Sequence, residues 1–170
     1  MTPARQERKT RCACPPTAIL AAAVGFFLMA SIPAPVTAAT TERIVTNRHT
    51  GLAMHGFDPV SYFVGPVPAV GRPELEWRHA GVTWRFHNEG NRAAFAAHPG
   101  VYMPQLGGYD PVAVARGAAA PGDPTLWAVV SGRLFLFHSE RSRRMFMADP
   151  EAAMGAAERR WPEVLRTLVP

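Results

Sequence analysis

Apolar and polar residues alternate in two neighbouring stretches of the chain and then change to a helical spacing. The stretches "ELEWRH" and "VTWRFH" flank Ala80 and Gly81, and their alternation places Trp84 and Phe86 on one face. This pattern predicts a β-hairpin. Asn88 then predicts a helix cap, and the following apolar spacing predicts a helix over residues 89–97 that covers the hairpin.

The same order of patterns occurs a second time. "LWAVV" and "RLFLF" flank Ser131 and Gly132, Ser139 predicts a cap, and a helix is expected over residues 140–148. A final helix is expected from Pro150 to about Arg160, and the spacing allows it to resume after Pro162. Hairpins followed by covering helices predict an α+β domain rather than a parallel sheet.

The two halves also share residues. Residues 81–100 aligned on residues 132–151 give eight identities in twenty, among them the Phe and His that end each hairpin and a later Phe in each helix. "GFDPVSYFVG" at Gly56 likewise returns as "GYDPVAVARG" at Gly108. These matches predict an internal repeat with units at about residues 55–105 and 107–160.

Less regular segments precede the first hairpin. Residues 39–50 are expected to be a polar linker, and the folded part is expected over residues 51–165. "VSYF" allows either a strand or a short helix, whereas the prolines and the glycine of Pro66–Pro73 predict a surface loop.

The first 38 residues have the pattern of an export signal. Basic residues precede an apolar run over Ala18–Ala30, and Val36 and Ala38 have the spacing of a cleavage site. The run is shorter than the ~20 residues that cross a bilayer, so a retained anchor is the alternative. We expect cleavage after Ala38 and a periplasmic or secreted chain with no stable membrane anchor.

Composition changes once this leader is set aside. Cys12 and Cys14 both lie in it, so the mature chain has no cysteine for disulfides, thiol catalysis or thiolate metal sites. The leader also holds four of the 18 basic residues and one of the 13 acidic ones, which leaves a net charge of +2. Because the remaining arginines are scattered apart from Arg141–Arg144, we expect no nucleic-acid binding.

Candidate chemistry centres on the histidine after each hairpin, and two interpretations stay open. In the first, His87 and His138 fill turns and bond to the backbone. In the second, the two imidazoles meet, and Asp58, Asp110 or His55 completes a zinc or copper site. Glu89 and Glu140 have a simpler interpretation, because a carboxylate in the first turn of a helix stabilises it and can pair with an arginine three residues later.

Several segments together resemble the secreted bacterial proteins built on the YHS domain. The resemblance covers roughly residues 51–165 and is carried by "GFDPVSYF", "GVTWRFHNEGNRAAFAAHPGVYMPQLGGY", "DPTLWAVVSGRLFLFHSE" and "ERRWPEVL". It implies a small α+β module of a kind often found beside heavy-metal transport and metalloenzyme domains. It also implies a metal-binding cysteine pair at the positions of His87 and Asn91, and many secreted relatives have a further cysteine at the position of Asp110.

The sequence leaves two functions open. One is an exported binding module that takes up a transition metal, copper or zinc, through its histidines and nearby carboxylates. The other is a non-catalytic structural or interaction domain that has lost the cysteine site and exposes Tyr62, Trp77 or Tyr109 to a periplasmic protein. We expect no enzyme, because the chain has no serine motif, no phosphate-binding glycine loop and no His-Glu pair at metalloprotease spacing.

Overall fold

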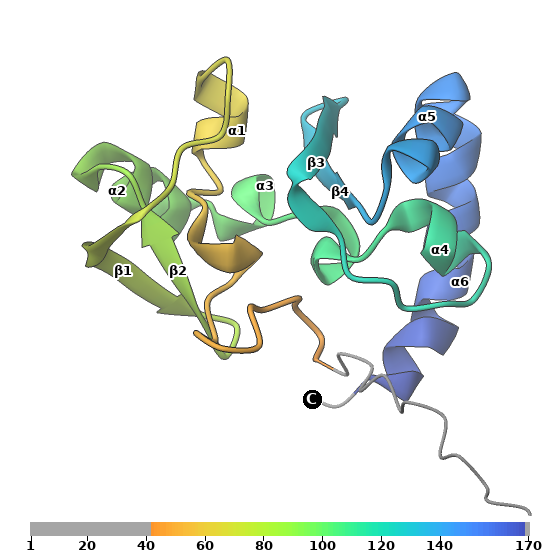
Figure 1. The fold of residues 1–170 in the computed structure, drawn as a ribbon, viewed down its shortest axis with the longest axis horizontal. Helices are drawn as coiled ribbons and strands as arrows, with labels where there is room; N and C mark the ends of the chain where they lie inside the picture. The colour runs from red at the N-terminus through yellow and green to blue at the C-terminus, as the bar shows by residue number, and fades with distance from the viewer. Residues whose placement is uncertain (1–41, 169–170) are drawn as a thin grey trace, which may run out of the picture. The chain divides into compact units, whose positions relative to one another are not determined.

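The computed structural model describes residues 42–168, and within them it has an α+β fold of six α-helices and two antiparallel hairpins (Figure 1). The predicted fold class is therefore confirmed. The expected leader over residues 1–38 and its cleavage site lie outside the described residues. None of the helices in the described part is long and apolar enough to cross a membrane.

The first half of the described chain contains a hairpin with a covering helix, as the sequence predicts. Ala80 and Gly81 form its turn, and both have a positive φ, as a type I′ hairpin turn requires. "VSYF" forms a short helix. The elements of this half are η1 (Met54–Gly56), α1 (Ser61–Val64), β1 (Arg72–His79), β2 (Val82–Phe86), α2 (Glu89–Ala97) and α3 (Pro99–Tyr102).

The second half has the same order of elements, with a longer last helix. Ser131 and Gly132 form the hairpin turn, again with positive φ. The elements are η2 (Gln105–Gly108), α4 (Pro111–Ala115), β3 (Asp123–Val130), β4 (Arg133–Phe137), α5 (Glu140–Ala148) and α6 (Pro150–Thr167). The bounds of β3, β4 and α5 each lie 51 residues after those of β1, β2 and α2. An origin by duplication stays a prediction.

Each hairpin packs against its helix through one phenylalanine. The ring of Phe95 in α2 lies 5.0 Å from that of Trp84 and 5.2 Å from that of Phe86. In the second half, the ring of Phe146 in α5 lies 4.8 Å from Phe135 and 5.3 Å from Phe137. All six side chains are buried, so the phenylalanines shared by the two halves are core residues.

Strand β4 is buried on both faces. Phe135 and Phe137 face the core formed with α5, while Leu134 and Leu136 belong to the core of the first half, beside Trp84 and Phe86. Successive side chains of a strand point to opposite faces, so one strand serves two cores. In β2 the positions that match Leu134 and Leu136 are Thr83 and Arg85, which are only half-buried.

Helix α6 closes a further core in the second half, where Ala157 and Val164 pack with Tyr109 and Val114. The sequence allowed a break at Pro162, but the helix runs through it to Thr167. Pro162 cannot donate a backbone hydrogen bond, yet the apolar residues on either side of it pack against the same core and keep the helix continuous.

Two expected boundaries differ from the structure. Residues 39–50 are predicted as a linker, but Ile44 packs in the core of the first half and Val45 in the core closed by α6. The apolar pair therefore joins both halves, and the folded part begins before Gly51. The loop predicted over Pro66–Pro73 also ends early, because β1 begins at Arg72 and includes Pro73 at its less regular end.

Candidate functional site

Asp58 holds the corner at which β2 meets α2. Its side chain is fully buried, and Oδ1 accepts a hydrogen bond from the backbone N–H of Val60 at 2.8 Å. Oδ2 accepts from the backbone N–H of His87 at 2.9 Å and from Nδ2 of Asn91 at 2.6 Å. A buried carboxylate needs such donors to offset its lost hydration. Asp58 therefore fixes the end of β2 and the first turn of α2.

Asp110 has the same place in the second half. It is fully buried, and Oδ1 caps α4 by accepting from the N–H groups of Val112 at 2.8 Å and Ala113 at 3.2 Å. Oδ2 accepts from the N–H of His138 at 2.8 Å. Ser142 stands where the first half has Asn91, and it bonds to Ser139 instead. The second carboxylate therefore lacks a side-chain amide donor.

His87 and His138 present exposed imidazoles at these corners. Nδ1 of His87 lies 3.4 Å from the carbonyl oxygen of Val70, and Nδ1 of His138 lies 3.0 Å from that of Pro121. A protonated Nδ1 can donate to that oxygen, which leaves Nε2 as the acceptor. The interpretation that the histidines fill turns and contact the backbone fits this geometry.

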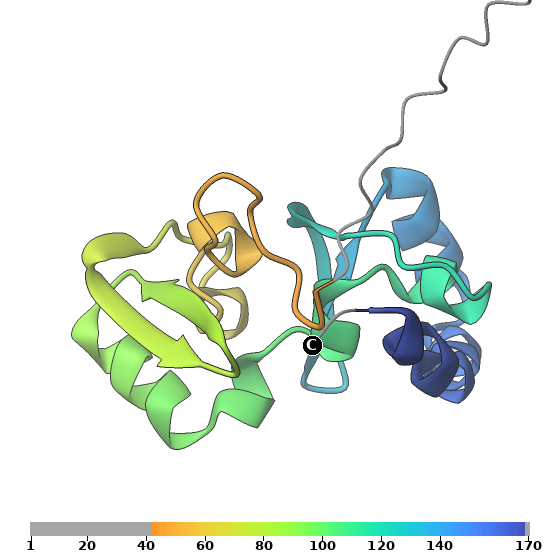
Figure 2. The same ribbon diagram turned by 90° about the horizontal axis from the view of Figure 1, so that it is seen from below.

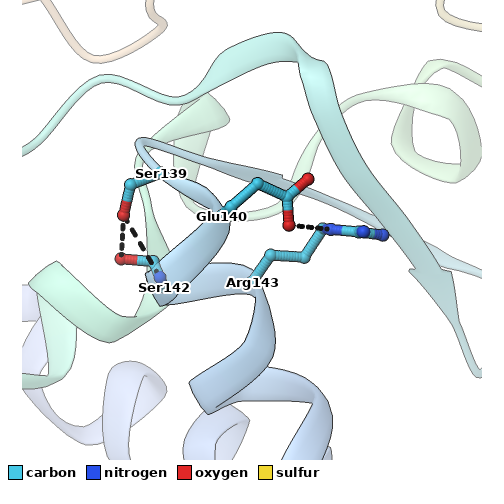
Figure 3. Close-up of polar contacts among 4 residues, drawn as sticks. All are labelled: Ser139, Glu140, Ser142 and Arg143. Carbon is cyan, nitrogen blue, oxygen red and sulfur yellow. Dashed lines mark hydrogen bonds and ion pairs between the residues drawn. The ribbon is translucent and has the colours of Figure 1, made fainter.

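The helix starts beside the two corners are capped as predicted. The side chain of Asn88 accepts from the N–H of Asn91, and that of Ser139 accepts from the N–H of Ser142. Glu89 pairs with Arg92 at 2.8 Å. Glu140 pairs with Arg143 at 3.1 Å, and Figure 3 shows these two side chains beside the Ser139 cap. These glutamates stabilise helix ends, and their carboxylates lie on the helix surface.

His55 lies in a different environment from the corner histidines. It has φ 53° and follows Met54 at φ 48°, whereas Gly107 occupies the matching left-handed place in the second half. Its exposed side chain lines a shallow hollow of about 290 Å³ with His49 and Pro121. Left-handed backbone is uncommon for a residue with a Cβ.

The five predicted metal ligands do not gather around one point. Asp58 lies with the backbone of His87, and Asp110 lies with the backbone of His138. Within residues 42–168, no three histidine, cysteine, aspartate or glutamate side chains are placed to hold a metal ion together. Metal binding by His87, His138, His55, Asp58 and Asp110 stays a prediction without a preformed site in this part of the chain.

The aromatic surface proposed for a partner is largely internal. Tyr62 and Tyr109 are buried, and of the three aromatics only Trp77 is exposed. Tyr62 donates to the carbonyl of Pro124 at 2.9 Å, and Tyr109 donates to that of Glu42 at 2.5 Å. Burial raises the pKa of Tyr62 well above its usual value and raises the pKa of Tyr109 to about 12. Both hydroxyls are therefore hydrogen-bond donors at neutral pH.

No sequence pattern indicated a hollow in the first half. It has a volume of about 510 Å³ and lies between the segment Glu42–Thr46 and the turn of the first hairpin. We call it the basic hollow, because Arg43 and Arg78 both line it. These arginines are 35 positions apart and belong to no motif, so only the fold could bring them together.

Comparisons with known proteins add no relative. No family model, no curated protein and no solved structure matches the chain. The resemblance to YHS domains therefore rests on the chain's own residues.

Proposed function

We propose that this chain is an exported, YHS-like binding domain without a catalytic role, and that its two histidine corners serve the fold. The bonding of Asp58 and Asp110 carries this proposal. Each carboxylate is fully buried and accepts hydrogen bonds through both oxygens from groups of its own chain. A carboxylate used in this way stabilises structure and has little remaining capacity for a metal ion or a substrate proton.

The surroundings of the corners support a binding role over catalysis. The two buried tyrosines keep their protons, so neither hydroxyl is a base near neutral pH. Glu89 and Glu140 are tied to arginines on their own helices. A binding domain instead needs a rigid frame and an accessible hollow, and the three cores together with the basic hollow provide them.

A second candidate function is copper or zinc binding through the exposed histidines. It is favoured by the contacts of Nδ1 with backbone carbonyls at His87 and His138, because metal-bound histidines commonly donate their other ring N–H to a carbonyl. A single imidazole at each corner is a weak ligand set, since structural zinc sites use four protein ligands and catalytic ones use three.

Metal titration of the mature chain separates the two candidates. The metal content of the purified protein is measured, copper and zinc are titrated by calorimetry, and melting is followed with each metal. We expect no stoichiometric metal and the same titration for His87→Ala and His138→Ala as for the unaltered chain. A one-to-one site that is lost in either variant would overturn the structural role of the corners and establish the metal function.

His98→Ala is the matched control, because His98 is an exposed histidine at the C-terminal end of α2, whereas His87 and His138 bond to the buried carboxylates through their backbone N–H groups. Weak metal uptake that falls equally in all three variants is ordinary surface binding. That result would leave the corners structural, as proposed.

A further inference from the structure

The basic hollow has the volume of a small-molecule site and a lining of both polar and apolar residues. Its volume of about 510 Å³ lies within the ~300–1,000 Å³ usual for ligand pockets. Two arginines, three threonines and the turn Ala80–Gly81 supply polar groups, and Ile44 and Val82 supply apolar ones. A lining of this kind suits a ligand with a charged head and a short apolar body.

The charges of the hollow favour an anion. Glu42 is its one acidic residue, and the carboxylate of Glu42 accepts a hydrogen bond from the hydroxyl of Thr46. Arg43 and Arg78 form no ion pair within residues 42–168, whereas Arg85, near the other end of the same hairpin, pairs with Glu76 at 2.8 Å. A guanidinium presents paired N–H groups that match the oxygens of a carboxylate or a phosphate.

The wall that carries Arg43 is fixed in place. Tyr109 donates to the carbonyl of Glu42 at 2.5 Å, and the N–H of Val45 donates to the carbonyl of Gly107 at 2.8 Å. The carbonyl oxygen of Arg43 lies so close to Gly107 that a Cβ there would stand 2.0 Å from it. The backbone of this wall is therefore held in place before a ligand binds, which lowers the entropy cost of binding.

The opposite wall is the turn end of the first hairpin. Arg78 and Thr83 are paired across β1 and β2, and Thr83 accepts the N–H of Ala53 through its carbonyl at 3.0 Å. The hairpin and the segment before it are thus joined at the hollow. Thr50 and Thr83 also line the hollow.

We infer that the basic hollow binds a small organic anion, a carboxylate or a phosphate, through Arg43 and Arg78, with its apolar part against Ile44 and Val82. This inference deepens the proposed binding function by naming the class of ligand. It is independent of the histidine corners, which line neither wall of the hollow.

The test is an NMR titration of the ¹⁵N-labelled mature chain with three probes, which are inorganic phosphate, acetate and hexanoate. We expect saturable shifts of the amide signals of Gly51, Gly81 and Thr83, and the response at those amides identifies the hollow. Tighter binding of hexanoate than of acetate is expected, because its additional methylenes leave water against the apolar wall.

Arg78→Gln and Arg43→Gln are each expected to weaken the response at the hollow by tenfold or more. Arg72→Gln is the matched control, since Arg72 is an exposed arginine of the same strand that does not line the hollow. Two variants are used so that a folding defect in one, visible as lost signal dispersion, leaves the other decisive.

Shifts that do not saturate with any probe, or that persist in both folded arginine variants, would overturn the inference. Saturation by phosphate alone or by carboxylates alone supports the site and names the head group. A failure here differs from a failure of the proposed function, which would appear in the metal titration as a stoichiometric site at the corners.

Discussion

At the scale of single residues, Asp58 and Asp110 are fully buried carboxylates whose hydrogen bonds hold the two corners of the fold. Sequence alone predicted the capping residues, because Asn88, Ser139 and the glutamates after them interact with neighbours a few positions away. The role of Asp58 could not be predicted in the same way. Its partners His87 and Asn91 are 29 and 33 positions away in the sequence, and no local sequence pattern predicts contacts over that separation.

Replacing Asp58 by asparagine tests its structural role. The amide would present N–H groups where one carboxylate oxygen now accepts from His87 and Asn91, so we expect a loss of about 2 kcal/mol or more in the free energy of unfolding. Urea unfolding followed by circular dichroism measures the change.

Asp123→Asn is the control for this substitution. Asp123 also accepts from a backbone N–H, that of Thr125 at 2.8 Å, but it is exposed. Its substitution should change the midpoint far less. Equal effects of the two substitutions would show that burial adds nothing, contrary to the role assigned to Asp58.

The raised pKa of Tyr109 predicts that the protein loses stability in alkaline solution. Burial raises its pKa from 10.0 to about 12, so the folded state holds the proton more tightly than the unfolded state does. The stabilisation is complete below the unfolded pKa and is lost as the pH rises from about 10 to about 12.

The urea midpoint should therefore decline steeply over that interval. Tyr109→Phe should lower the midpoint near neutral pH, because its bond to Glu42 is gone, but should make the alkaline decline shallower. A variant that declines as steeply as the parent would assign the effect to other groups, Tyr62 among them, whose pKa burial also raises.

At the scale of elements, the sequence predicted what is periodic and missed what is held by tertiary contacts. The alternation around Trp84 and Phe86 and the capped helices gave β2, α2 and α5 because local spacing determines them. The expected linker was wrong, since Ile44 and Val45 are only two apolar residues and their burial depends on two distant cores. Pro162 is the opposite case. Proline favours a break in a helix, but packing keeps α6 continuous through this residue.

Pro162→Ala measures how much the proline inside α6 lowers the free energy of unfolding. The substitution restores an N–H that can donate to the carbonyl of Glu158, one turn earlier, so we expect the free energy of unfolding to rise by about 1 to 3 kcal/mol. Thermal unfolding checks the direction. Pro150→Ala is the comparison, because proline at the first helical turn removes no helical bond. A fall in stability at Pro162 would mean that the ring itself packs usefully.

At the scale of the whole molecule, residues of the second half complete the core of the first half. The core of the first half includes Leu134 and Leu136, and the ring of Trp127 lies 5.4 Å from that of Tyr62. These three residues come from the hairpin of the second half. The similarity of the halves therefore does not make them independent domains.

A fragment of residues 39–104 tests this dependence. We expect it to remain unfolded, with poorly dispersed amide signals, because its core lacks Leu134 and Leu136. Co-expression with residues 105–170 should restore dispersion if the second half folds around it. A fragment that melts cooperatively alone would show that the first half is a domain by itself.

The two-sided burial of β4 has a consequence for how this protein tolerates change. A strand with one side toward solvent can carry polar side chains at every second position, as the half-buried Thr83 and Arg85 illustrate in β2. All four side chains of residues 134–137 are buried, so each of these consecutive positions requires an apolar side chain of fitting size. Across a library of all single substitutions, the deepest loss of folded protein should fall there, as an unbroken block rather than an alternating pattern.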